Sequence, residues 1–175
     1  NSLDRKVLGN SRPTVTGGWT STLSYKNLSL FARFDYALGH TIYNDLKARS
    51  MGQYQGQFNL IENVQDMWTE TNPGASYPAF SYADQLNKQN IWREGSKFFE
   101  KAGYMALREI TLSYTLPRTW IKAMKMANAN VYVTGQNLFY LTPYDGASPE
   151  AILDGYDYGR YPTPRTLIFG LNVTF

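Results

Sequence analysis

The strongest constraint on the fold is a period-two alternation of apolar and polar residues that recurs in five long segments. The last segment, TLIFGLNVTF at residues 166–175, carries an apolar side chain at every odd position. Side chains on a β-strand point alternately to the two faces of a sheet, so this pattern predicts a strand with one apolar face. The sequence predicts strands at about 14–25, 28–39, 104–116, 130–141 and 165–175.

The connections between these strands alternate between short and long. Lys26-Asn27 is a polar two-residue turn between two long alternating segments, which is the pattern of a β-hairpin. Pro117 ends the third strand because proline has no backbone N–H to donate to the ladder. The other short connection contains WIKAMKMANA, which has helical spacing, whereas residues 40–103 and 142–164 form long loops.

The fourth strand has the least regular alternation. Val131 and Val133 share one parity, but the residues that follow do not continue the pattern clearly. Gly135 predicts a bulge or kink here, after which the facing of the side chains changes.

The loop at 40–103 is too long to be bare chain in a compact protein. It has helix-like spacing at Ile61, Val64 and Trp68, and proline and glycine breaks follow. We therefore expect a structured surface excursion that contains short helices.

Composition and the length of apolar runs exclude a helical membrane protein but allow a membrane β-barrel. Aromatic residues make up 15% of the chain, yet the mean hydropathy is −0.42 and no apolar run approaches the roughly 20 residues of a spanning helix. Spanning β-strands need only about 9–11 residues, half of which face a polar interior. Long half-apolar strands with unequal loops are typical of an outer-membrane β-barrel wall, whereas a soluble sandwich more often has shorter strands.

Five strands cannot close a barrel of this kind, whose smallest members have eight. In hydrocarbon every backbone N–H and C=O must be paired, so the open edges of the first and fifth strands need partners. We expect the remainder of the barrel to come from a separate chain or from another part of the same one. The opening segment NSLDRKVLGN has no apolar stretch after a basic start, so it is not expected to be a signal peptide.

Three segments carry motifs of known order and spacing: GYMALREITLSYTLP at 103–117, VYVTGQNLFYLTPYDGASPE at 131–150, and GRYPTPRTLIFGLNVTF at 159–175. They resemble the C-terminal region of SusC/RagA-type TonB-dependent outer-membrane transporters, and VLGNSRPTVTGGW at 7–19 resembles the entry to the preceding hairpin. The matching residues are Leu107, Arg108, Leu112, Tyr114, Pro117, Gly135, Gln136, Asn137, Leu138, Thr142, Tyr144, Gly146, Pro149, Glu150, Tyr161, Pro162, Arg165, Gly170 and Phe175.

The resemblance implies an all-β fold: about the last five strands of a 22-stranded antiparallel barrel in the bacterial outer membrane, with long extracellular loops. It implies import of nutrients such as oligosaccharides or oligopeptides, with a SusD-like surface lipoprotein as partner and energy supplied through TonB. The plug and the segment that contacts TonB would lie outside this chain. The last strand resembles the signal read by the barrel assembly machinery, which would comprise Leu167, Phe169, Gly170, Leu171, Val173 and Phe175.

Two further groups of residues are candidates for function. Aromatic residues on the strands are expected at the membrane interface, where amphipathic rings sit at headgroup level: Trp19, Tyr25, Tyr36 and Tyr114. Residues of the second long loop are candidate contacts for a ligand or for the SusD-like lipoprotein that would form a lid: Tyr144, Asp145, Tyr156, Asp157, Tyr158 and Arg160. For the tyrosines of this loop, folding of the loop itself is an equal alternative.

The sequence argues against several other classes. The chain has no cysteine and only one histidine, His40, so it offers neither a thiolate site nor an imidazole pair for zinc. The net charge of +3 is spread along the chain, which argues against nucleic-acid binding. Acidic residues near Asp145 could bind calcium, but their spacing is not that of an EF-hand and fits turn chemistry. We expect no enzyme, metal or cofactor, and the alternative function is a soluble secreted carbohydrate-binding β-module.

Overall fold

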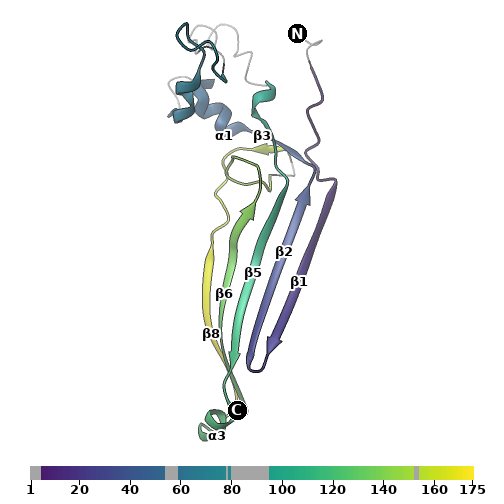
Figure 1. Ribbon diagram of the computed structural model, residues 1–175, viewed down its shortest axis with the longest axis vertical. Coiled ribbons are helices and arrows are strands. Elements are labelled where there is room, and N and C mark those ends of the chain that lie inside the picture. Colours follow the sequence, from purple (N-terminus) through teal and green to yellow (C-terminus); the bar gives the residue numbers. More distant parts are fainter. Residues whose placement is uncertain (1–4, 54–58, 78, 80–94, 152–153) are drawn as a thin grey trace. The chain divides into compact units, whose positions relative to one another are not determined.

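The computed structural model describes residues 5–53, 59–77, 79, 95–151 and 154–175 (Figure 1). Parts of both predicted loops, at 54–58, 78, 80–94 and 152–153, lie outside the described residues. The chain forms two compact units. The sheet unit comprises Pro13–Gly39, Gly103–Pro143 and Pro162–Phe175, and the loop unit comprises Asn1–Arg12, His40–Ala102 and Tyr144–Tyr161.

The sheet unit is a five-stranded antiparallel sheet in the order β1-β2-β5-β6-β8, with its long strands side by side (Figure 1). Its strands are β1 Val15–Tyr25, β2 Leu28–Leu38, β5 Tyr104–Thr115, β6 Asn128–Leu141 and β8 Thr166–Thr174. Each bound lies within two residues of the range that the alternation predicts. As expected, the first and the last of these strands form the two edges of the sheet.

The hairpin turn has the predicted form, whereas the other short connection is helical over only part of WIKAMKMANA. Tyr25 pairs with Leu28 across a two-residue turn, in which Lys26 has a positive φ of 53°. Turns with positive φ match the twist of the two strands of a hairpin. The other connection contains α3, Arg118–Ala123, which follows Pro117 and lies at the end of the sheet where β5 and β6 are joined (Figure 1).

The two faces of the sheet differ sharply in chemistry. Residues that pair directly across neighbouring strands share a face, so the register assigns each side chain to one of the two faces. We define the apolar face by Trp19, Leu23, Tyr25, Leu28, Leu30, Phe34, Tyr36, Leu107, Ile110, Leu112, Tyr114, Val131, Val133, Phe139, Leu167, Phe169, Leu171 and Val173. We define the polar face by Thr20, Thr22, Ser29, Arg33, Asp35, Glu109, Thr111, Ser113, Asn130, Thr134, Gln136, Thr166, Asn172 and Thr174, and Phe31, Tyr132 and Ile168 also lie on it.

The bulge expected at Gly135 lies elsewhere. Gly135 pairs regularly with Ile110 and Leu167, and the irregular pairing occurs two residues later, where Asn137 has a positive φ of 52°. The expected change of facing in β6 is also wrong, because odd residues stay on the apolar face on both sides of the irregularity. The strand has two more residues here than β2, and an even insertion preserves the alternation.

The change of facing occurs instead in β5. Arg108 is an extra residue opposite the step from Arg33 to Phe34 on β2. One inserted residue reverses the alternation, so Leu107 joins the apolar face although Ile110 and Leu112 have the opposite parity. Without the bulge, Arg108 would share the face of Ile110.

The loop unit contains a small second sheet in the order β4-β3-β7, formed by β3 Thr41–Asn44, β4 Phe99–Lys101 and β7 Tyr156–Asp157. Short helical turns surround it: α1 Asp45–Ala48, η2 Arg49–Gln53, η3 Glu62–Asp66 and η4 Ser96–Phe98. Asn44 caps α1 by accepting a hydrogen bond from the Lys47 amide at 3.0 Å. One core cluster contains Tyr43, Ala48, Met51, Met67 and Phe98, and a second contains Ile42, Ala102, Tyr144 and Ala151.

Candidate functional site

A charged network on the polar face of the sheet is centred on Arg108. Its Nε donates to Asp35 Oδ1 at 2.6 Å, and its Nη2 donates to Asp35 Oδ2 at 2.9 Å. Its Nη1 donates to the Tyr140 hydroxyl at 2.9 Å. The guanidinium also lies 5.4 Å from the ring centroid of Tyr140 and 6.0 Å from that of Tyr104. The bulge in β5 therefore directs a bidentate ion pair to the polar face.

A second polar chain continues across the same face. Arg33 Nη2 lies 3.7 Å from Glu109 Oε2, and the Thr111 hydroxyl donates to Glu109 Oε1 at 3.3 Å. Thr111 also shares a hydrogen bond of 2.7 Å with Thr134 on β6. These contacts join β2, β5 and β6 through side chains as well as through the backbone ladder.

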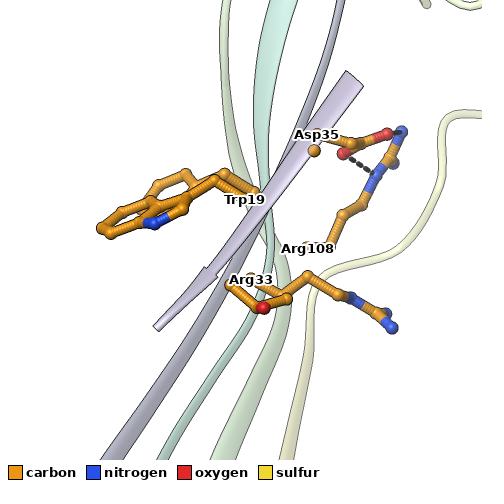
Figure 2. Close-up of a pocket in the computed structure, with 7 residues that line it drawn as sticks. Trp19, Arg33, Asp35 and Arg108 are labelled. Atoms are coloured by element: carbon orange, nitrogen blue, oxygen red, sulfur yellow. Dashed lines mark hydrogen bonds and ion pairs between the residues drawn. The ribbon is translucent and has the colours of Figure 1, made fainter. Parts of the chain in front are cut away.

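A hollow of about 400 Å³ opens beside this network in the sheet unit (Figure 2). Gly18 and Thr20 of β1 line it together with Arg33, Asp35 and Arg108. Figure 2 shows the side chains of these last three residues on one side of the strands and Trp19 on the other. The small residues of β1 leave the charged groups accessible, so this part of the polar face can contact water or a solute.

Side chains of the apolar face are exposed on each of the five strands of the described chain, although Leu107 within it is only 6% exposed. Its side chains on β8 have large exposed fractions, 65% for Leu167, 78% for Phe169 and 61% for Leu171. Apolar surface of this extent is unusual on a soluble monomer and marks an interaction surface. The strand β2 alone has 11 residues, which is enough to cross an apolar band about 25 Å tall at the usual tilt of about 35–45°.

All four predicted interfacial aromatic residues belong to the apolar face. Tyr25 is the last residue of β1, Tyr114 is the penultimate residue of β5, and Tyr36 lies two residues from the end of β2. Trp19 is in the middle of β1 and stacks on Phe34 with the ring centroids 5.6 Å apart. Three of the four thus lie close to strand ends, and their position at headgroup level stays a prediction.

The predicted assembly signal occupies β8 and the residue after it. Leu167, Phe169, Leu171 and Val173 share the apolar face, and Phe175 is 89% exposed. Gly170 pairs with Tyr132 of β6, and the ring of Tyr132 lies over this glycine on the polar face. A Cβ at residue 170 would lie 2.1 Å from Tyr132 Cζ, so this pair needs glycine on β8.

The structure divides the six candidate residues of the second loop by burial. Asp157 is fully buried, and its carboxylate accepts hydrogen bonds from the Tyr144 hydroxyl at 2.8 Å and from the amides of Ala147, Ser148 and Gly159. Tyr144 is only 7% exposed. Burial raises the pKa of Tyr144, and its hydrogen bond to Asp157 raises the pKa further. These two side chains hold the loop together and are not accessible to a ligand.

The other four candidates remain accessible. Tyr156 and Tyr158 are 40% and 52% exposed and stack with their ring centroids 5.7 Å apart. Arg160 Nη2 lies 3.6 Å from Asp154 Oδ2, with both side chains largely in solvent. Asp145 is exposed and accepts a hydrogen bond from Lys47 Nζ at 3.2 Å. Contact of these four residues with a ligand or a lid stays a prediction.

Two further features of the loop unit could not be predicted from the sequence. Lys47 is largely buried, and its Nζ lies 3.0 Å from Glu100 Oε1 as well as near Asp145. Burial lowers the pKa of Lys47, but the hydrogen bonds to the two carboxylates outweigh it and the pKa is raised. His40, which follows Gly39 at the start of the loop unit, is buried, and its Nε2 lies 3.1 Å from the carbonyl oxygen of Pro149. Over the described ranges, no three side chains of His, Cys, Asp or Glu gather in a way that could hold a metal ion.

The chain has clear relatives among known proteins. It is 33% identical over 182 residues to TonB-dependent receptor P26 of Formosa agariphila, in an alignment that covers 98% of this chain and 18% of the relative. It is 26% identical over 176 residues to TonB-dependent receptor SusC of Bacteroides thetaiotaomicron, covering 99% of this chain and 16% of the relative. No protein-family model matches the sequence.

Comparison with solved structures also finds proteins of this kind. The RagAB peptide importer in its closed-closed state matches with a TM-score of 0.79 and 26% identity, over 97% of this chain and 18% of that chain. The RagAB peptide transporter matches with a TM-score of 0.75 and 28% identity, over 91% of this chain and 17% of that chain. The chain belongs to the SusC/RagA-type TonB-dependent receptors. It spans less than a fifth of the length of these relatives.

Membership of this receptor family confirms several expectations from the sequence. TonB-dependent receptors lie in the bacterial outer membrane and are not enzymes. The five-stranded antiparallel sheet with its short helices matches part of the RagA structure. None of the helices in the described parts of the chain is long and apolar enough to span a membrane.

Proposed function

We propose that this chain forms about five C-terminal strands in the wall of a closed, 22-stranded outer-membrane barrel. The apolar face contacts lipid, and the polar face lines the lumen. The barrel imports nutrients, either oligosaccharides or oligopeptides, with energy supplied through TonB and a plug outside this chain. A SusD-like lipoprotein covers the extracellular side, where the loop unit lies.

The observation that carries this proposal is the apolar face, which is continuous and exposed over all five described strands of the sheet. Burying such a surface in hydrocarbon removes it from water, and the charged network of Arg108 and Asp35 lies on the opposite face. The edges at β1 and β8 then pair with other barrel strands, because unpaired backbone groups cannot persist in lipid. The relative that imports peptides, RagAB, supports the transport of oligomers as the class of function.

The exposed residues of the loop unit are the candidate contacts for the nutrient or for the lipoprotein. The stacked rings of Tyr156 and Tyr158 offer a flat surface to a sugar ring or a peptide side chain. Arg160 and Asp145 add charges of opposite sign near the two ends of the loop at 142–164.

Extraction of the full-length receptor tests the proposal. We expect the receptor to sediment with the outer membrane and to require detergent for release, because the apolar face is in contact with lipid. The measurement is immunoblotting of membrane and soluble fractions, with a known periplasmic protein as control. Release of a monodisperse folded protein by buffer alone would favour the soluble carbohydrate-binding module instead.

Removal of Phe175 tests the assembly signal. We expect deletion of this residue to lower the amount of receptor inserted in the outer membrane several-fold, because the terminal aromatic residue is part of the strand that the assembly machinery reads. Transport per inserted barrel should change little. Quantitative blotting of heat-modifiable receptor measures the amount inserted, and nutrient uptake divided by that amount gives transport per barrel. Phe175→Tyr is the control. Normal insertion of the deletion variant would contradict the signal role.

A further inference from the structure

The connection between β5 and β6 carries a concentrated positive charge. The segment LPRTWIKAMKMANA, residues 116–129, contains Arg118, Lys122 and Lys125 and no acidic residue. It includes the short helix α3, Arg118–Ala123, and a following turn in which Lys125 has a positive φ of 55°. All three basic side chains are exposed.

The same helix and its C-cap residue expose two large apolar side chains. Trp120 is 60% exposed and Met124 is 51% exposed. Residues four apart lie on one side of a helix, so Trp120 and Met124 lie together, roughly opposite to Arg118 and Lys122. Ile121 is only 5% exposed and holds the helix against the rest of the sheet unit. The connection is thus amphipathic: one edge is aromatic and apolar and the other is basic.

The position of α3 along the strands matches the edge of the apolar face. Aromatic residues end this face on three strands: Tyr25 closes β1, Tyr114 is the penultimate residue of β5, and Phe175 follows β8. Rings in such positions mark the headgroup level of a barrel. The helix begins four residues after Tyr114, and therefore within about 14 Å of that level.

We propose that α3 and the turn after it bind anionic phospholipid headgroups of the leaflet nearest the short turns. Trp120 and Met124 insert at the level of the headgroups, and Arg118, Lys122 and Lys125 pair with phosphates. This inference rests on the proposed function, because it requires the apolar face to be in lipid. The position of α3 at the end of that face and the charge of the segment favour a lipid surface over a protein partner.

Depth measurement by spin labelling tests the position of the helix. The full-length receptor, with any other cysteine replaced by serine, carries a nitroxide at Trp120→Cys in vesicles of phosphatidylethanolamine and phosphatidylglycerol. We expect the label to collide more with oxygen than with a nickel chelate, as a label at Leu171→Cys should. A label in the other short turn, at Lys26→Cys, serves as the control that faces water.

The reference sites separate the two possible failures. If residue 120 is as accessible to nickel as residue 26 while residue 171 remains in lipid, α3 is a solvated turn and this inference is wrong. If residue 171 is also accessible to nickel, the proposed orientation of the apolar face is wrong, and the inference fails with it.

Charge removal tests the headgroup contact. The variant Arg118→Gln/Lys122→Gln/Lys125→Gln should bind phosphatidylglycerol about tenfold more weakly, because each exposed basic residue near an anionic surface adds to the attraction. The matched control, Arg5→Gln/Lys6→Gln/Arg12→Gln, removes the same charge from the loop unit and should bind as wild type does. Native mass spectrometry of the detergent-solubilised receptor measures the bound lipid. Equal loss in both variants, or no loss in either, would overturn the proposal.

Discussion

Leu171→Arg is expected to remove most of the receptor from the outer membrane, whereas Asn172→Arg should leave the assembled amount close to wild type. Leu171 lies on the apolar face in the middle third of β8 and pairs with Val131. An arginine facing lipid costs up to about 2–4 kcal/mol, the value at the bilayer midplane, and less toward the headgroups. Asn172 pairs with Asn130 on the polar face, where a guanidinium remains in water.

The measurement is the fraction of receptor that shows heat-modifiable mobility in purified outer membranes. Leu171→Met is the control for the side-chain change itself, because it keeps an apolar side chain of similar volume and should assemble normally. The two arginine variants differ by one position in the same strand, so their effects on synthesis and export should match. Equal assembly of both would refute the assignment of the two faces.

The strands and their facing could be predicted from the sequence wherever the alternation is strict. In β8 every odd residue is apolar, and the hairpin around Lys26 is defined by a turn of only two residues, so both features are local. Arg108 could not be placed in this way. Its direction depends on a bulge, which is a property of the pairing between β5 and β2 and not of either segment alone.

The sequence did contain one sign of this bulge. Arg108 has the parity of Ile110, Leu112 and Tyr114, so strict alternation would put a charge on the apolar face. Such a conflict between charge and parity indicates an inserted residue in the ladder. In β6 the corresponding irregularity adds two residues relative to β2 and leaves the parity unchanged, which explains why Gly135 was a misleading guide.

The interior of the loop unit was beyond the reach of sequence reasoning for a different reason. Asp154 and Asp157 both follow the pattern of acidic turn residues near glycine, and each accepts a hydrogen bond from an amide two residues later. Only the folded loop distinguishes them, because Asp157 also accepts a hydrogen bond from the hydroxyl of Tyr144, 13 residues earlier. Residues predicted as surface contacts thus include two that form the interior.

This difference leads to the second large effect that we expect. Asp157→Ala should destabilise the loop unit locally by roughly 3–5 kcal/mol, because the buried hydroxyl of Tyr144 and the partly buried amides of Ala147 and Ser148 lose their acceptor, and each unsatisfied group costs about 1–3 kcal/mol. Asp154→Ala is the matched control: its side chain is 43% exposed, so the change should cost less than about 1 kcal/mol.

Hydrogen exchange in the full-length receptor measures both effects. The amides of Ala147 and Ser148 donate to Asp157, so they should exchange about a hundredfold faster or more in Asp157→Ala and remain protected in Asp154→Ala. Asp157→Asn sharpens the result, because it keeps the size of the side chain but replaces one accepting oxygen by an NH₂ donor. Since Oδ2 accepts three of the hydrogen bonds and Oδ1 one, the asparagine variant should lie between wild type and alanine. Equal protection of these amides in all variants would mean that the loop is held by its apolar clusters alone.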